Sequence, residues 1–118
     1  MLSEVEMKAA LQRYLDAWNA ADIDGVVDMF TDDAVVHDPY GQQPYEGKAA
    51  FQAFFAGVME QHPVFVLDSP IRASYGDSAA MAVTARGAHL TIRFIDVMRF
   101  DDAGKLVEMI SYRGQTDQ

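Results

Sequence analysis

The sequence predicts an α+β fold, in which a curved antiparallel sheet forms a cone and three helices from the N-terminal half of the chain pack on its concave face. Apolar residues recur at helical spacing through the first half, whereas apolar and polar residues alternate with a period of two from residue 63 onward. A length of 118 residues fits a single domain, residues 1–118, because a chain of this size supports one hydrophobic core.

The first half is expected to contain a long helix, a short helix and a third helix. Ser3 and Glu6 have the spacing of a capping box. The apolar stripe that follows recurs about every 3.6 residues and consists of Met7, Leu11, Tyr14, Leu15 and Trp18. A short second helix is expected to begin at Asp22, and the third helix to run from about residue 48 to residue 59.

The segments between the second and third helices are expected to be less regular. Asp32 and Asp33 indicate a break before a short strand, AVVHD. The following segment, residues 39–47, contains two prolines and two glycines and is therefore expected to be a loop.

Four strands in series are expected after residue 63: VFVLDSPIR, AAMAVTAR, LTIRFIDVMRF and KLVEMISYR. Short turns join them, so they are expected to form an antiparallel meander. Pro70 is expected at an edge or bulge, where it would help to bend the sheet. A bent sheet covered by helices leaves a natural place for a pocket.

Charge and composition exclude several classes of partner. The chain has 9 basic and 18 acidic residues, a formal net charge of −9, whereas nucleic acids and anionic membranes need a basic surface. The absence of cysteine excludes disulfides and thiolate chemistry, and the histidine spacing matches no metal site. No segment approaches the roughly 18 apolar residues of a membrane span, and MLSEVEMKAA lacks a signal peptide's apolar run. A cytoplasmic protein is expected.

One acidic residue lies on the apolar face of the strand IRFIDVMRF. Ile92, Phe94, Asp96, Met98 and Phe100 share one face, while the two arginines of the strand lie on the other. An ionised, unpaired carboxylate on that face would cost several kcal/mol, roughly, whereas burial favours the protonated form. Asp96 therefore either finds a partner elsewhere in the fold or is held as a neutral hydrogen-bond donor.

Tyr14 and Asp38 are two further polar residues expected to point inward. Tyr14 lies on the apolar stripe of the first helix, so its hydroxyl either bonds a nearby carbonyl or acts as a donor in a dry site. In VVHDP, Val36 and Asp38 share a face while His37 points away, and Pro39 keeps the preceding residue extended. Asp38 is either solvated at the strand end or a carboxylate at a pocket mouth, where partial burial makes it a usable base.

Two segments, QRYLDAWNAADIDGVVDMFTDDAVVHDPYG and FIDVMRFDDAGKLVEM, resemble bacterial ketosteroid isomerases. These enzymes belong to the nuclear-transport-factor-like, or SnoaL-like, superfamily, and the similarity extends from about residue 7 to residue 112. The resemblance implies that Asp38 is a proton-shuttling base and that Tyr14 and a protonated Asp96 form an oxyanion hole. A carboxylic acid kept neutral by an apolar site is an established feature of this family. The reaction implied is migration of a steroid double bond, with no metal or organic cofactor.

The chain departs from the family at Phe55, where a tyrosine often supports the oxyanion-hole tyrosine through a hydrogen bond. Phe30 likewise lacks the hydroxyl found there in some relatives. The resemblance therefore implies less support for Tyr14 and Asp96 without changing their roles. Trp18 and Tyr40 receive no functional role from the resemblance.

The implied ligand is a steroid or a similar planar apolar molecule. Side chains expected to line its pocket are Val26, Phe30, Phe54, Phe55, Val83, Phe94 and Met98. The open face of the sheet is expected to be covered by a second copy of the chain, giving a homodimer.

Three other functions remain open from the residues alone. A polyketide cyclase of the same fold tends to use a pocket histidine or arginine, and His37, Arg93 and Arg99 are all expected to point outward. An epoxide hydrolase would need an arginine between two carboxylates, which the residue spacing does not provide. A non-catalytic carrier of apolar ligands has no reason to hold two acids and a phenol inward together.

Overall fold

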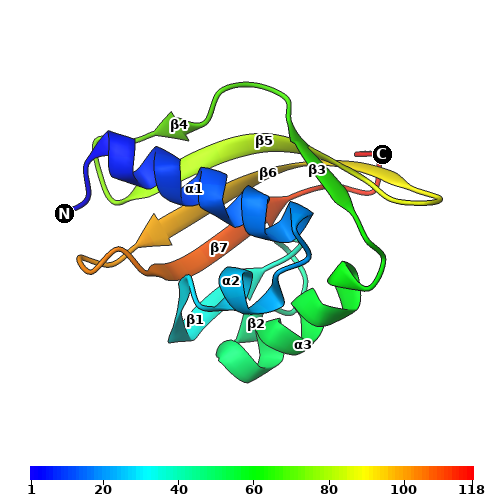
Figure 1. Ribbon diagram of the computed structural model, residues 1–118, viewed down its shortest axis with the longest axis horizontal. Coiled ribbons are helices and arrows are strands. Elements are labelled where there is room, and N and C mark those ends of the chain that lie inside the picture. The colour runs from blue at the N-terminus through cyan, green and yellow to red at the C-terminus, as the bar shows by residue number, and fades with distance from the viewer.

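Three helices and seven strands build the molecule, and a computed structural model describes all of residues 1–118 (Figure 1). The helices are α1 (Glu4–Asn19), α2 (Ile23–Val27) and α3 (Lys48–Met59). The strands are β1 (Phe30–His37), β2 (Tyr45–Glu46), β3 (Val64–Leu67), β4 (Arg72–Ala73), β5 (Ser78–Arg86), β6 (Thr91–Phe100) and β7 (Leu106–Tyr112). The α+β class is confirmed.

Local hydrogen bonds explain where the first two helices begin. The Ser3 hydroxyl accepts from the Glu6 backbone N–H at 3.1 Å, and the Glu6 carboxylate accepts from the Ser3 N–H at 3.0 Å. This reciprocal pair is the predicted capping box. The Asp22 carboxylate accepts from the Gly25 N–H at 3.0 Å, so Asp22 caps α2.

The seven strands form one sheet in the order β2-β1-β7-β6-β5-β3, with β4 also paired to β5. The meander β5-β6-β7 is antiparallel, as predicted. The expected single strand VFVLDSPIR is instead two short strands, β3 and β4, because Pro70 cannot donate a ladder hydrogen bond and the chain leaves the sheet between Leu67 and Arg72.

Strand β1 is longer than the sequence predicts and pairs with β7 in parallel. It begins at Phe30, which pairs with Leu106, and regular pairing resumes at Val35 with Glu108. The predicted break at the two aspartates is therefore an irregularity inside β1 rather than its start. The parallel pairing makes the sheet mixed instead of purely antiparallel, and it brings the end of β1 beside the end of β7.

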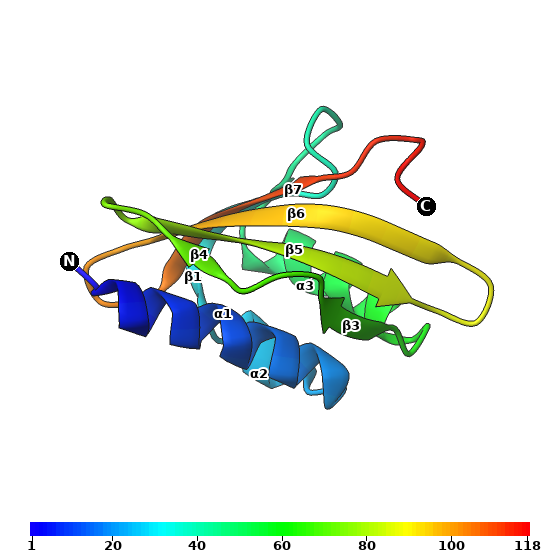
Figure 2. The ribbon, with the colours of Figure 1, turned by 90° about the horizontal axis from the view of Figure 1, so that it is seen from above.

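The sheet curves over the helices, with α1 and α2 on one side of it (Figure 2). The core between these layers contains 22 buried hydrophobic residues, including the fully buried Leu11, Phe51 and Leu106. No helix of the chain is both long enough and apolar enough to cross a bilayer.

Candidate active site

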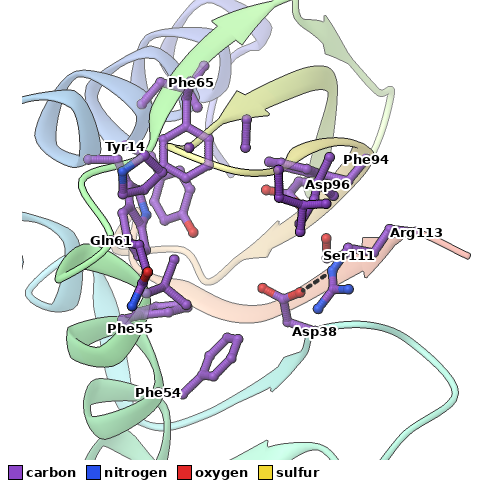
Figure 3. Close-up of a pocket in the computed structure, with 18 of the residues that line it drawn as sticks. Tyr14, Asp38, Phe54, Phe55, Gln61, Phe65, Phe94, Asp96, Ser111 and Arg113 are labelled. Atoms are coloured by element: carbon purple, nitrogen blue, oxygen red, sulfur yellow. Dashed lines mark hydrogen bonds and ion pairs between the residues drawn. The ribbon is translucent and has the colours of Figure 1, made fainter. Parts of the chain in front are cut away.

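A cavity of about 350 Å³ opens between α1, α3 and the inner face of the sheet (Figure 3). This volume lies in the usual range of small-molecule sites, about 300–1,000 Å³. Its apolar lining is Leu15, Trp18, Phe54, Phe55, Val58, Pro63, Phe65, Ala85, Ala88, Leu90, Ile92 and Phe94. Its polar lining is Tyr14, Asp38, Gln61, His89, Asp96, Ser111 and Arg113, with Gly87 at the turn. A mostly apolar cavity with a few convergent polar groups is typical of a site for an apolar ligand.

Strand β6 sets the depth of the cavity. Ile92, Phe94 and Asp96 line it, whereas Met98 and Phe100, on the same face, are enclosed in the core. The cavity opens toward the exposed turn between β5 and β6, residues 87–90, several of which lie at its rim. Asp96 therefore lies at the inner end, where the apolar core begins.

Asp96 is buried without an ionic partner. Its side chain is 3% exposed, its Oδ1 makes no hydrogen bond, and no arginine or lysine forms an ion pair with it. On β6 it pairs with Met81 of β5 and Ser111 of β7. Burial, and next the charge of Asp38, raise the pKa of Asp96 to about 8, while the Ser111 hydroxyl and Arg113 oppose the rise in part. Asp96 is therefore protonated at neutral pH and can donate a hydrogen bond.

The raised pKa of Asp96 predicts how the stability of the folded chain changes with pH. The unfolded chain releases the Asp96 proton near pH 4, roughly, whereas the folded chain keeps it until about pH 8. The folded state binds more protons in between, so the free energy of unfolding should fall as pH rises from about 4 to about 8. Asp96→Asn should remove this contribution. Urea midpoints of both proteins at about pH 5 and about pH 8 measure it, and identical pH dependence would contradict the assignment.

Tyr14 points from α1 into the same cavity. Its side chain is 4% exposed, and its hydroxyl donates to the Met109 sulfur at 3.3 Å. A thioether is a weak acceptor, so the hydroxyl remains a donor available to a better one. Burial raises the pKa of Tyr14 well above its ordinary value, and the charges of Asp96 and Asp38 raise it further, while the Trp18 side chain lowers it. Tyr14 therefore stays protonated across the working range of pH.

Asp38 lies just beyond the end of β1 and forms an ion pair with Arg113, just beyond the end of β7 (Figure 3). The Arg113 Nε donates to the Asp38 Oδ1 at 3.3 Å. The parallel pairing of β1 with β7 accounts for this proximity, since His37 is opposite Ile110. Burial raises the pKa of Asp38, and Arg113 opposes that rise by favouring the ionised form. Of the two acids in the cavity, Asp38 is therefore the one that ionises at lower pH, because Arg113 lies beside it.

The structure brings together Tyr14, Asp38 and Asp96 in one cavity, together with three of the seven expected lining residues, Phe54, Phe55 and Phe94. The other four are core residues instead: Val26, Phe30, Val83 and Met98, each at most 1% exposed and away from the cavity wall. Val26 lies on α2 itself, and the strand period identifies the inward face of Val83 and Met98 correctly without showing that the core encloses them. Their expected contact with a ligand is therefore not supported by the geometry.

Sequence reasoning missed Arg113, the cation of the site. Met109 and Ser111 of β7 and Arg113, the residue just after it, alternate at the strand period and face inward toward Tyr14, Asp96 and Asp38. The same period of two that identified Asp96 could have identified Arg113. The expectation that no arginine lies near the two carboxylates is wrong, because Arg113 pairs with Asp38 and also lowers the pKa of Asp96.

His89 and Gln61 also line the cavity and were not identified as site residues. Both lie in exposed connecting segments, where no periodicity applies. The His37 Nε2–H instead donates to the Glu108 carboxylate at 3.3 Å on the other face of the sheet, as its outward placement predicts.

A cone of mixed sheet and helices that encloses a phenol, two carboxyl groups and an arginine defines a small-molecule site of the nuclear-transport-factor-like type. Residues 11–109 match the SnoaL-like domain family, and the chain belongs to this family.

Relatives of this chain include two kinds of enzyme. It is 30% identical over 110 residues to the steroid Delta-isomerase of Nocardioides simplex, covering 91% of this chain and 89% of that protein. It is also 30% identical over 129 residues to the epoxide hydrolase LasB of Streptomyces lasalocidi, covering 99% of this chain but only 44% of LasB. A solved structure of SalBIII, an epoxide hydrolase/cyclase-like enzyme of pyran ring formation in the polyether salinomycin, superposes with a TM-score of 0.89. That structure shares 27% identity, covering 96% of this chain and 94% of SalBIII.

Proposed function

We propose that this protein is an isomerase that moves the double bond of 3-oxo-Δ5-steroids into conjugation with the ketone. One observation carries the proposal. A buried acid without an ionic partner, Asp96, lines the same apolar cavity as Tyr14 and the carboxylate of Asp38. Two neutral donors and one base are what an enolising site requires.

The reaction begins at the carbon between the ketone and the alkene. Asp38 takes a proton from this carbon, and the electron pair of the broken C–H bond delocalises onto the ketone oxygen as a dienolate. Asp38 then returns the proton to the far alkene carbon, forming the new C–H bond. A positioned base of this kind contributes roughly 10²–10⁴-fold to the rate.

The developing negative charge on the ketone oxygen needs donors at the inner end of the cavity. Tyr14 and protonated Asp96 supply two, and both side chains are buried. Donors that are already oriented stabilise such a charge strongly, and losing one typically costs about 2.7–4 kcal/mol. The rest of a steroid is hydrocarbon, which suits a wall of Phe54, Phe55 and Phe94.

The test is to add a Δ5-3-ketosteroid to the folded protein and follow the ultraviolet absorbance of the conjugated enone. Catalysed growth of the enone band is expected. A folded protein that binds the steroid without forming enone would refute the isomerase proposal.

A second candidate is the opening of an epoxide, and Arg113 is the observation that favours it. Asp96 would transfer its proton to the epoxide oxygen as the ring C–O bond breaks. Asp38, held by Arg113, would take the proton from the attacking hydroxyl or water as the new C–O bond forms. LasB and SalBIII, described as an epoxide hydrolase and an epoxide hydrolase/cyclase-like enzyme, support this alternative.

Arg113→Met tests whether Arg113 keeps Asp38 ionised. Arg113 lowers the pKa of Asp38, so its loss should move the acid limb of the pH–rate profile to higher pH. Isomerisation should retain its maximal rate at higher pH, because the base itself is intact. Measuring the enone rate from about pH 4 to about pH 9 checks this. An unmoved acid limb would show that Arg113 does not tune Asp38.

The expected homodimer remains a prediction. It is supported by apolar side chains on the outer face of the sheet, where Ile95 is 49% and Tyr112 is 48% exposed.

A further inference from the structure

The Trp18 side chain contains a buried hydrogen-bond donor that is unused. Trp18 is 4% exposed, lines the cavity, and its Nε1 has no hydrogen-bond partner. An indole nitrogen can only donate, and nearly all buried donors in folded proteins are paired. The unpaired indole N–H lies in the cavity itself, so its natural acceptor is a group that enters the cavity or reorients in it when a ligand binds.

The hydroxyl oxygen of Tyr14 is a candidate acceptor on the same helix face. Trp18 follows Tyr14 by four residues on α1, so both lie on one face of the helix, and their ring centroids are 6.4 Å apart at 67°. The Trp18 side chain lowers the pKa of Tyr14, as a donor close to the phenol oxygen would, although no hydrogen bond joins the two residues. The Tyr14 proton points to Met109, which leaves the oxygen lone pairs free to accept.

Packing holds the indole in place without offering it another acceptor. Trp18 meets Phe55 edge-on at 5.3 Å and 78°, and Phe65 at 5.2 Å and 70°. Both partners are hydrocarbon rings. The resemblance to ketosteroid isomerases implies a supporting tyrosine hydroxyl at the position of Phe55, and the phenyl ring of this chain has no such donor.

We propose that Trp18 is a positioning residue, whose Nε1–H donates to the Tyr14 oxygen when the Tyr14 hydroxyl turns from Met109 to a ligand oxygen. The Trp18 N–H then donates to the Tyr14 oxygen, and the Tyr14 hydroxyl donates to the ligand. The indole thus supplies a hydrogen bond that the Phe55 ring cannot. The inference rests on the proposed function, since it assigns Tyr14 the task of binding a developing oxyanion.

The first experiment measures binding rather than turnover. A phenol such as 2-naphthol places partial negative charge on an oxygen in the site, and its fluorescence reports both binding and ionisation. Trp18→Phe keeps an aromatic ring but removes the N–H. Its affinity for 2-naphthol should fall about 3- to 10-fold, the range expected for one hydrogen bond. In the enone assay, kcat should fall by a similar factor with little change in KM.

Rescue distinguishes a lost donor from a damaged core. Adding Phe55→Tyr to the Trp18→Phe variant supplies a hydroxyl in the same cavity, on the ring that packs edge-on against Trp18, and should restore most of the affinity and kcat. Phe55→Tyr alone is the matched control: because Phe55 lines the cavity, its own effect on affinity and kcat is measured, and the rescue is the difference between the effects of this substitution with and without the Trp18 N–H. A hydroxyl that restores nothing, while the double variant is folded, would overturn the proposal.

A shape-matched analogue covers the case in which Trp18→Phe fails to fold. Trp18 is the only tryptophan, so growth on β-(3-benzothienyl)alanine replaces this one N–H by sulfur and leaves the ring system in place. The same loss of 2-naphthol affinity is expected. Affinity within about twofold of wild type would overturn the role of Trp18. Wild-type protein that binds 2-naphthol through Trp18 but forms no enone would refute the isomerase proposal alone.

Discussion

Asp38→Asn is expected to reduce steroid isomerisation by at least 10²–10⁴-fold, roughly, because the amide cannot accept the substrate proton. The substitution preserves the shape of the side chain and its position beyond β1. It also removes the negative charge that raises the pKa values of Asp96 and Tyr14. The measurement is kcat from the enone absorbance at neutral pH.

Binding provides the control for this variant. Asp38→Asn should bind 2-naphthol at least as tightly as the wild type, since a negative charge that opposes a bound oxyanion has been removed. A variant that loses turnover but retains binding identifies Asp38 as the base. Full activity in Asp38→Asn would mean that another group takes the proton.

Asp96→Leu is expected to reduce turnover by about 10²–10³-fold, the usual consequence of removing one donor from an oxyanion hole. The fold should tolerate the change, because an apolar side chain suits a site that is 3% exposed and has no ionic partner to leave behind. Measurements are kcat and the urea midpoint. Little loss of activity would remove Asp96 from the oxyanion hole.

Asp96→Asn is the matched variant, because its amide can still donate but does not titrate. Wild-type activity should fall as pH rises above about 8, where Asp96 loses its proton. Asp96→Asn should retain more activity than Asp96→Leu, and its rate should no longer fall in that range. A basic limb that persists unchanged in Asp96→Asn would assign it to another group.

The sequence predicts which face of a helix or strand points inward better than it predicts which inward residues line the cavity. A period of two places Phe94, Asp96 and Met98 on one face of β6, and all three do face inward. Only tertiary packing decides that Phe94 and Asp96 line a cavity while Met98 is covered. Depth depends on where α1 crosses the sheet, and no local pattern encodes that crossing.

The ion pair of the site could not be predicted from adjacent residues, because its members are 75 positions apart. The strand period of β7 makes Arg113 an inward residue, but its partner follows from the parallel pairing of β1 with β7. Parallel pairing of distant strands has no turn motif to mark it, unlike the hairpins of the meander. The charge states of Asp38 and Asp96 differ for the same reason: long-range contacts decide them.

The hydrogen bond from Tyr14 to Met109 orients a donor inside the cavity. The Met109 thioether is a weak acceptor, so a carbonyl oxygen that enters the cavity would take over the hydrogen bond of the Tyr14 hydroxyl, because oxygen accepts far better than sulfur. Ligand binding would therefore cost little side-chain entropy at Tyr14, and only a weak hydrogen bond to sulfur would have to be broken. In the proposed complex the Met109 sulfur would be the weaker of two alternative acceptors for the Tyr14 hydroxyl, which keeps its proton throughout.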